Sequence, residues 1–263
     1  MTPTLVFDIE TVPDVTGLRR VHGLPAELGD VDVLAWATQQ RRATTGNDFM
    51  PHHLQRIIAI GCALREGDSF RIWSLGEASD PEPELIRRFY DGIDRYTPQL
   101  VSWNGSGFDL PVLNHRALVH GVAAPRFWEC GDNDREFRYN NYLNRYHARH
   151  LDLMDVLSMY QVRSTATLDA VARLAGFPGK LGMHGSEVHA AYLAGRHDDI
   201  RHYCETDVMN TYLLYLRFQQ LRGELPAGQY AAEVSLAREK IAASKEAHWR
   251  EFIAAWDANA QNG

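Results

Sequence analysis

The sequence predicts an α/β domain in which a mixed β-sheet carries helices on both faces. Apolar, β-prone runs alternate with stretches of helical periodicity, and these runs lie at 5–9, 56–64 and 99–103. A Glu-Gly-Asp turn at 66–68 joins the second run to another strand at 70–75, which indicates an antiparallel hairpin. Strands interspersed with helices favour layers of helices packed on a sheet.

The remaining periodic segments are expected to be helices. They lie at 83–96, 109–120, 167–175, 186–194, 197–222 and 229–258, and a strand that runs into a helix is expected at 150–157. Gly121 is expected to end the second helix. We divide the chain into a domain at 1–222 and a helical extension at 223–263, which we expect to pack back on that domain and not to bind a partner. Only a helix is expected after 223, so we expect no polymerase domain in cis.

Composition describes an ordinary globular protein. The 263 residues are 45% hydrophobic and 23% charged, which suffices for a sizeable core in one large domain or two small ones. The formal net charge of −7 argues against a bulk nucleic-acid binder and is neutral on an enzyme, because binding needs only a local basic path.

The cysteines are few and scattered. Cys62, Cys130 and Cys204 form no C-x-x-C pair, which argues against a disulfide scaffold and against a zinc site. No signal peptide precedes the first strand, and no apolar run approaches the length of a membrane span. The sequence therefore predicts a soluble, cytoplasmic protein without disulfides or membrane contact.

Two long segments are expected to lie outside the regular elements. Residues 11–55 are broken by glycines and prolines and read as an irregular insertion, with a short helix at 28–42; a flap and a covering loop are equally compatible. Residues 125–149 interleave aromatic residues with arginines, as in surfaces that stack bases and contact phosphates. The alternative for 125–149 is a surface flap with its aromatic rings tucked in.

Acidic residues stand at three element boundaries or helix faces. Asp8 and Glu10 should point to the same side of the first strand, which alone is a common pattern of solvated acids. Asp109 follows the turn at 104–107, and Asp207 lies in the helix at 197–222. Carboxylates that converge at one sheet edge require a cation, and hard oxygen ligands favour Mg²⁺ or Mn²⁺. In a two-metal site, ions about 3.5–4 Å apart polarise the phosphate and activate water.

These residues lie in three ordered motifs: Phe7-Asp8-Ile9-Glu10-Thr11, Asn104-x-x-x-Phe108-Asp109 and Tyr203-Cys204-x-x-Asp207. With them the chain resembles the 3′–5′ exonuclease domains of family B DNA polymerases, within the DEDD superfamily, and most of all stand-alone bacterial PolB-like exonucleases of the DEDDy type. The stretches 150–155 and 167–172 are also similar, and the resemblance runs from residue 4 to about 220. It implies a ribonuclease H-like fold and two Mg²⁺ or Mn²⁺ ions per site.

The resemblance also implies a role for each residue. Asp8 bridges both ions, Glu10 and Asp207 hold the ion that activates water, and Asp109 reaches the second ion through water. Tyr203 orients the attacking water. Asn104 and Phe108 shape the pocket, and the other expected substrate contacts are Thr11, Arg145, Tyr146 and Lys180. A carboxylate is usual in the related proteins near His184, which weakens any claim about the loop that carries Lys180.

The third motif leaves two candidates for the water-orienting residue. His202 precedes Asp207 by five positions and Tyr203 by four. Residues four apart share a helix face, whereas residues five apart diverge by about 140°. Helix geometry therefore favours Tyr203.

The expected activity is a metal-dependent 3′–5′ exonuclease that hydrolyses the terminal phosphodiesters of single-stranded DNA to 5′-mononucleotides. RNA trimming by the same chemistry is an alternative, since a 2′-hydroxyl contact cannot be read from sequence. A second alternative is a catalytically silent nucleic-acid-binding module on the same fold.

Overall fold

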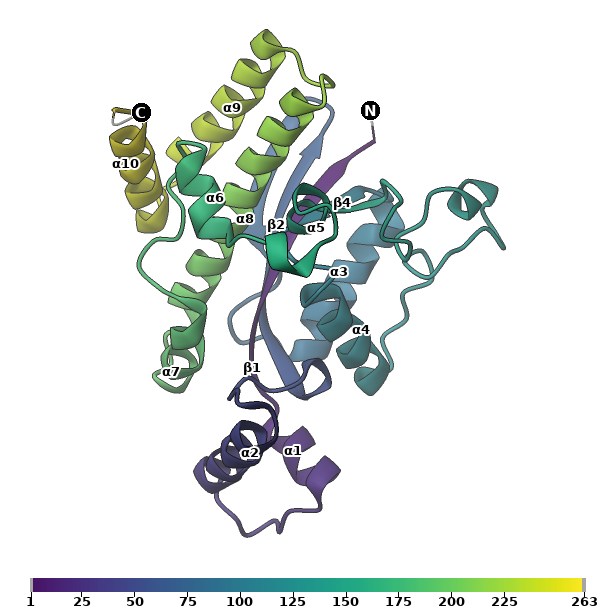
Figure 1. Ribbon diagram of the computed structural model, residues 1–263, viewed down its shortest axis with the longest axis vertical. Coiled ribbons are helices and arrows are strands. Elements are labelled where there is room, and N and C mark those ends of the chain that lie inside the picture. The colour runs from purple at the N-terminus through teal and green to yellow at the C-terminus, as the bar shows by residue number, and fades with distance from the viewer. Residues whose placement is uncertain (1, 262–263) are drawn as a thin grey trace.

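The computed structural model (Figure 1) describes residues 2–261 and contains one five-stranded sheet in the order β3-β2-β1-β4-β5. The strands are β1 (Thr4–Pro13), β2 (Gln55–Glu66), β3 (Ser69–Ser74), β4 (Gln99–Ser102) and β5 (His150–Asp152). β1, β2 and β3 pair antiparallel, whereas β4 and β5 run parallel to β1. This mixed order is a ribonuclease H-like topology and confirms the predicted fold class.

Helices cover both faces of this sheet (Figure 1). Because side chains alternate along a strand, Leu5, Phe7 and Ile9 of β1 face a core formed with α3 (Glu82–Tyr96) and α4 (Asp109–His120). Val6 faces the opposite core, which is formed mainly with α8 (His197–Leu221). The shorter helices are α5 (Leu153–Leu157), α6 (Leu168–Leu174) and α7 (Val188–Leu193). One-turn 3₁₀ helices lie at His52–Leu54, Arg135–Arg138, Val162–Ser164 and Gly185–Glu187.

The single final helix predicted at 229–258 is wrong. Two helices take its place, α9 (Ala227–Ala242) and α10 (Ala247–Gln261). The chain reverses between them, so that Ile241 of α9 and Trp249 and Phe252 of α10 are all buried in the core on the α8 side. A straight helix would carry most of these apolar side chains away from the domain, and their burial therefore explains the break.

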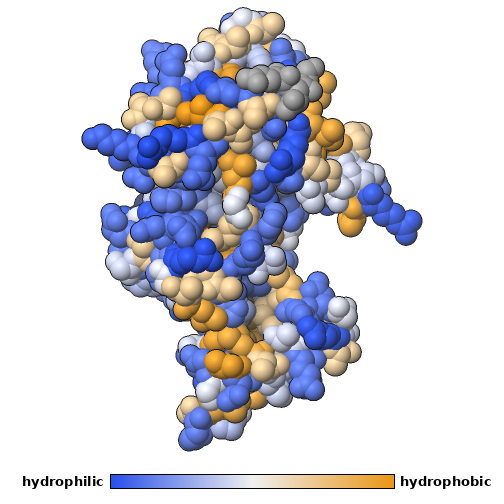
Figure 2. All heavy atoms as spheres, turned by 90° about the vertical axis from the view of Figure 1, so that its left-hand side faces the viewer, coloured by the Kyte–Doolittle hydropathy of each residue, from blue (hydrophilic) through white to orange (hydrophobic). Residues whose placement is uncertain are grey.

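The insertion is more regular than expected. β1 continues to Pro13, and the insertion then contains α1 (Val15–His22) and α2 (Asp30–Thr45) around a small core of its own. That core consists of Leu18, Val33, Ala37, Met50 and Leu54. Figure 2 shows the insertion as a lobe set off from the rest of the molecule, with apolar side chains near the junction.

A buried ion network fixes the root of this insertion. Arg116 of α4 lies 2.6 Å from the Oδ2 of Asp14, the residue that caps α1, and 2.5 Å from the Oε2 of Glu82 at the start of α3. Glu82 also accepts a hydrogen bond from the backbone N–H of Ile57 at 2.7 Å. Breaking a buried pair by removing one partner is strongly destabilising, so this network holds α1, α3, α4 and β2 in one arrangement.

The arginine-rich segment at 125–149 forms an arm whose rings are partly tucked in. Phe137 and Tyr142 are buried, and the guanidinium groups of Arg126 and Arg149 lie 4.3 and 4.0 Å from the centre of the Phe137 ring. These contacts between arginines and aromatic rings therefore stabilise the arm itself, as the alternative of a flap with tucked-in rings predicts. Tyr146 remains 70% exposed. Across residues 2–261, no helix has the length and apolar character needed to cross a membrane.

Candidate active site

Within residues 2–261, β1 brings the first two carboxylates to a stretch that has no neighbouring strand on its β4 side. Its parallel pairing with β4 ends at Val6, so the following residues extend past the end of β4. Asp8 and Glu10 therefore point to the α8 side, the same side as Val6. Cys204 of α8 approaches this point, with its Sγ 3.4 Å from the carbonyl oxygen of Asp8 and 3.6 Å from its Oδ2.

Asp109 joins this edge from the first turn of α4. Its Oδ1 accepts a hydrogen bond from the backbone N–H of Ile9 at 3.0 Å, between the two acids of β1. The turn before Asp109 is shaped by Asp152, whose carboxylate accepts from the N–H groups of Asn104 (2.9 Å) and Ser106 (2.8 Å). Asn104 adopts a left-handed φ of 65°, a conformation that asparagine tolerates better than most residues.

Asp207 and Tyr203 reach the cluster from one face of α8, as their four-residue spacing predicts. Both are buried, with 3% and 4% of their surfaces exposed. The Nζ of Lys180 lies 2.5 Å from the Oδ2 of Asp207 and also donates to the Tyr203 hydroxyl. The Oδ1 of Asp207 is buried without a hydrogen-bond partner.

His202 points elsewhere. Its ring stacks on His248 of α10, with 4.1 Å between the ring centres, and its side chain is 33% exposed. The geometry therefore places the Tyr203 hydroxyl, and not the His202 imidazole, beside Asp207.

Burial raises the pKa values of all four carboxyl groups, and repulsion within the cluster adds to those of Asp8 and Glu10. The pKa of Asp8 is raised first by burial and then by Asp109 and Asp207, and that of Glu10 by burial and then by Asp8. Burial raises the pKa of Asp109 to about 7, against the opposing hydrogen bond from Ile9. The pKa of Asp207 is raised by burial although Lys180 lowers it. The cluster carries more negative charge than one lysine can balance.

The residues present fit a hard divalent cation. Four carboxylates supply oxygen donors, and the unpartnered Oδ1 of Asp207 is a buried acceptor that a cation would satisfy. The sulfur of Cys204 lies within 4.8 Å of carboxylate oxygens of Asp8 and Glu10. Burial raises the pKa of this thiol well above the usual value. Because Mg²⁺ and Mn²⁺ prefer carboxylate oxygens to sulfur, the oxygen donors define the site.

Several predicted substrate contacts border the cluster. The ring of Phe108 lies 5.6 Å from that of Phe49 and 5.5 Å from that of His52, so the end of the insertion reaches the site. The Oγ1 of Thr11 donates to the Oε1 of Gln55 at 3.1 Å and fixes the strand beyond Glu10.

Arg145 and Tyr146 lie farther along the arm. Arg145 pairs with Asp155 at 3.0 Å, and its guanidinium lies 4.8 Å from the centre of the Tyr160 ring. The Tyr146 ring lies 5.0 Å from the same ring. Arg145 lines a cavity that also includes Ser106 and Gly107 of the turn before Asp109. Arg145 therefore borders that turn, and Tyr146 lies beside Tyr160, instead of joining the carboxylate cluster.

Two supporting residues had no assigned role in the sequence. Asp169 accepts a hydrogen bond from the backbone N–H of Lys180 at 2.7 Å, and Asn210 of α8 exchanges two hydrogen bonds with Gly179. Together they fix the loop that presents Lys180. The sequence held a signal for Asn210, because an amide in a largely apolar stretch of helix needs a hydrogen-bond partner when it is buried. In the structure the Asn210 side chain is fully buried.

Comparison with protein families identifies the family of the chain. A model described as a predicted 3′–5′ exonuclease related to the exonuclease domain of PolB matches residues 47–256. That range includes Asp109, Lys180, Tyr203 and Asp207, while the strand with Asp8 and Glu10 precedes it. Since the match spans most of the chain, the chain belongs to this family of predicted 3′–5′ exonucleases related to the exonuclease domain of PolB.

Proposed function

We propose that the chain is a metal-dependent exonuclease that removes 5′-mononucleotides from the 3′ ends of single-stranded DNA. The supporting observation is the convergence of four carboxylates with raised pKa values from β1, α4 and α8 on one sheet edge. Such a cluster is unfavourable for the fold unless divalent cations compensate its charge.

Asp8, Glu10, Asp109 and Asp207 would hold two Mg²⁺ or Mn²⁺ ions. When bound, these ions neutralise charge on the phosphate, activate water and stabilise the leaving oxygen. The hydrogen bond from Ile9 to Asp109 keeps the second motif in register with the first. The protein thus contributes a preorganised set of oxygen ligands.

Tyr203 and Lys180 complete the proposed site. Burial and Asp207 raise the pKa of Tyr203, so its hydroxyl keeps its proton at neutral pH and acts through hydrogen bonds. Burial opposes the charge on Lys180, but Asp207 and Tyr203 outweigh burial and raise its pKa. Lys180 therefore stays cationic, and it orients the Tyr203 hydroxyl and contacts the substrate phosphate.

The surroundings suit a single strand that enters past aromatic residues. The rings of Phe49 and His52 lie beside that of Phe108, the residue before Asp109, and these rings would contact the terminal nucleotide together with Asn104. Arg145 and Tyr146 would contact nucleotides farther from the end, through phosphate pairing and base stacking. RNA is the second substrate class that this chemistry can use.

The decisive experiment follows 5′-labelled and 3′-labelled oligonucleotides of DNA and RNA with Mg²⁺ or Mn²⁺. We expect stepwise shortening of the 5′-labelled strand and release of a labelled mononucleotide from the 3′-labelled one. Asp8→Ala should abolish both. The matched control is Asp68→Ala, because Asp68 is an exposed acid in the turn between β2 and β3.

Three results would contradict the proposal in different ways. Equal activity in Asp8→Ala would reject the site. Cleavage of RNA alone would replace DNA as the substrate. Binding of oligonucleotides without cleavage under any of these conditions would favour the silent module.

A further inference from the structure

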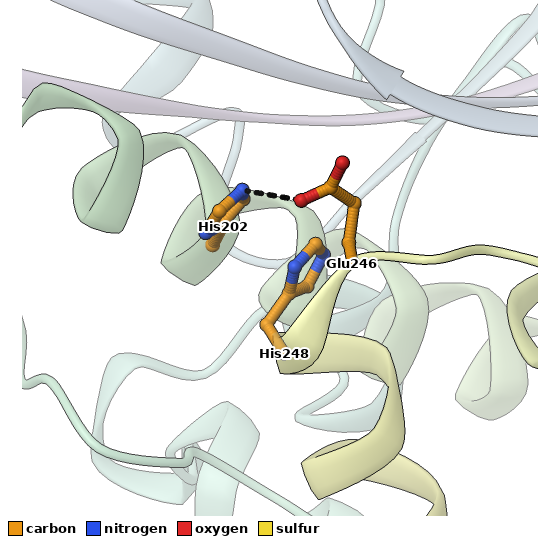
Figure 3. A group of neighbouring side chains, drawn as sticks. All are labelled: His202, Glu246 and His248. Atoms are coloured by element: carbon orange, nitrogen blue, oxygen red, sulfur yellow. Dashed lines mark ion pairs between the residues drawn. The ribbon is translucent and has the colours of Figure 1, made fainter.

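A second group of ligand-type side chains lies between α8 and the C-terminal helices (Figure 3). It consists of His202 on α8, Glu246 just before α10 and His248 in the first turn of α10, and their ligand atoms all lie within 4.8 Å of one another. We propose that these three residues bind a transition-metal ion of the Zn²⁺ class, at a site separate from the carboxylate cluster. This proposal does not depend on the exonuclease activity.

His248 is already positioned as a ligand. Its Nε2 lies 3.1 Å from the Oε2 of Glu205, and the other oxygen of Glu205 accepts from the Ser74 hydroxyl at 2.8 Å. A carboxylate beside one ring nitrogen fixes the proton there and leaves the lone pair of the other nitrogen for a metal ion. The contact with Glu205 therefore leaves the Nδ1 of His248 as the nitrogen whose lone pair is available to a metal ion.

That Nδ1 atom is buried and has no hydrogen-bond partner. The His248 side chain is 10% exposed, so water does not readily compensate for the missing partner. Among the side chains that the structure describes, those of residues 2–259, only Trp103 and Asp207 share this condition, and Asp207 belongs to the proposed metal-binding carboxylates. Unpartnered buried polar atoms are rare in folded proteins, and a bound ion would satisfy this one.

The other two ligands are more exposed than His248. The Nε2 of His202 lies 3.8 Å from the Oε2 of Glu246, whose side chain is 61% exposed. The His202 and His248 rings are stacked at an angle of 15°, so their lone pairs do not meet at one point. The His202 ring must therefore rotate out of the stack to share an ion with His248. A cavity of about 400 Å³, lined by Met183, Asp199 and Thr206 among others, adjoins both histidines and gives it room.

The donor set selects the class of ion. Two imidazoles and one carboxylate are a common ligand set for Zn²⁺, which keeps a fourth position for water. Imidazole suits Zn²⁺ and its neighbours in the first transition row, whereas Mg²⁺ prefers oxygen donors. No ligand-spacing motif marks this site in the sequence. His202 lies more than forty positions before Glu246 and His248, and only the fold brings the three side chains together.

An ion here would connect α10 to the helix that carries Tyr203. His202 directly precedes Tyr203, while Glu246 and His248 belong to the C-terminal segment. Binding is therefore expected to stabilise the docking of α10 on α8.

The test titrates the metal-stripped full-length protein with Zn²⁺ against a chromogenic chelator, in buffer that contains excess Mg²⁺. Compared with wild type, His248→Ala and His202→Ala should each lose one equivalent of bound Zn²⁺, and Asp8→Ala should retain it. His197→Ala is the matched control, because His197 lies on the same helix outside the cluster. Glu205→Gln should weaken binding by about 10–100-fold, because it removes the charge that orients His248.

Glu246→Gln guards against misfolding, because this side chain is mostly exposed and its substitution should leave the fold intact. Zn²⁺ should raise the melting temperature of the wild type and of His197→Ala more than that of Glu246→Gln. Unchanged Zn²⁺ binding in the two histidine variants would overturn the proposal, as would loss of this equivalent in Asp8→Ala. Cleavage with Mg²⁺ is scored separately, so failure of the zinc site leaves the exonuclease proposal untouched.

Discussion

The backbone N–H of Ile9 donates a hydrogen bond to the Oδ1 of Asp109 at 3.0 Å. This bond joins the central strand to the first turn of α4 at the point where β1 extends past β4. Asp109 therefore has two separable properties. It is a hydrogen-bond acceptor that holds β1 and α4 together, and it supplies charge to the carboxylate cluster.

Two substitutions at Asp109 should separate these properties. Asp109→Asn keeps an oxygen acceptor for Ile9 and removes the charge, so its metal-free stability should equal or exceed that of wild type. Asp109→Ala leaves the buried N–H unpaired and should be less stable than Asp109→Asn by about 1–3 kcal/mol. Both should lower the cleavage rate by about a hundredfold or more. Urea unfolding in EDTA and single-turnover cleavage measure the two effects, and wild-type activity in Asp109→Asn would contradict the assigned role.

The raised carboxyl pKa values predict an unusual pH dependence for the metal-free protein. A carboxyl with a higher pKa in the folded state binds protons more tightly when folded, so its contribution to stability is present at low pH and is lost as pH rises. For Asp109 this loss should fall between about pH 4, the unfolded value, and about 7, the folded value.

Melting in EDTA should therefore show that the carboxylate cluster becomes more destabilising from pH 5 to pH 7.5, and Mn²⁺ should reverse this effect most strongly at the higher pH. Asp109→Asn serves as the comparison, because it removes one titrating group and should flatten the profile. A metal-free profile that does not change with this substitution would contradict the prediction.

Tyr203→Phe should slow cleavage and leave the metal ligands in place. The ring stays buried, but the hydroxyl that meets Lys180 is lost, so water and phosphate are held less accurately. We expect a decrease of about tenfold to a hundredfold in the single-turnover rate, with an unchanged Mn²⁺ dependence. Tyr230→Phe, on α9, is the matched control. Loss of activity in His202→Ala with full activity in Tyr203→Phe would reverse the assignment.

The site elements could be predicted because their signals are local. β1 begins as an apolar run, Gly121 ends α4, and the spacing of Tyr203 and Asp207 fixes their common face on α8. Contacts between remote segments had no such signal. The pairing of Lys180 with Asp207 joins a loop to a helix 27 residues away and depends on how Asp169 and Asn210 hold that loop.

The wrong boundaries also have physical reasons. Gly23 and Gly46 suggested an irregular insertion, but with φ values of 61° and 70° they are the left-handed residues that end α1 and α2. The break between α9 and α10 contains neither glycine nor proline, so sequence favoured one helix. Burial of Trp249 and Phe252 against the domain decides the reversal there, and tertiary packing overrides propensity.

The close packing of α8 against Gly61 allows a steric test of the site. It is the register partner of Asp8 on β2, and α8 approaches the sheet there so closely that a Cβ would lie 2.9 Å from the Sγ of Cys204 and 3.0 Å from the Cγ2 of Val208. Gly61→Ala should therefore push α8 away from β1 and separate Asp207 from Asp8. We expect a loss of about 1–3 kcal/mol in unfolding free energy, measured in urea, and a larger proportional loss of Mn²⁺-dependent cleavage than of folded protein.

Gly92→Ala is the control for Gly61→Ala. Gly92 lies within α3 with open space where its Cβ would be, so alanine should preserve or raise stability by about 0.5–1 kcal/mol. Adding Cys204→Ala to Gly61→Ala should recover part of both losses, because it removes the nearest clashing atom. If Gly61→Ala cleaved at the wild-type rate, the close approach of α8 to the sheet would not be what aligns the two halves of the carboxylate cluster.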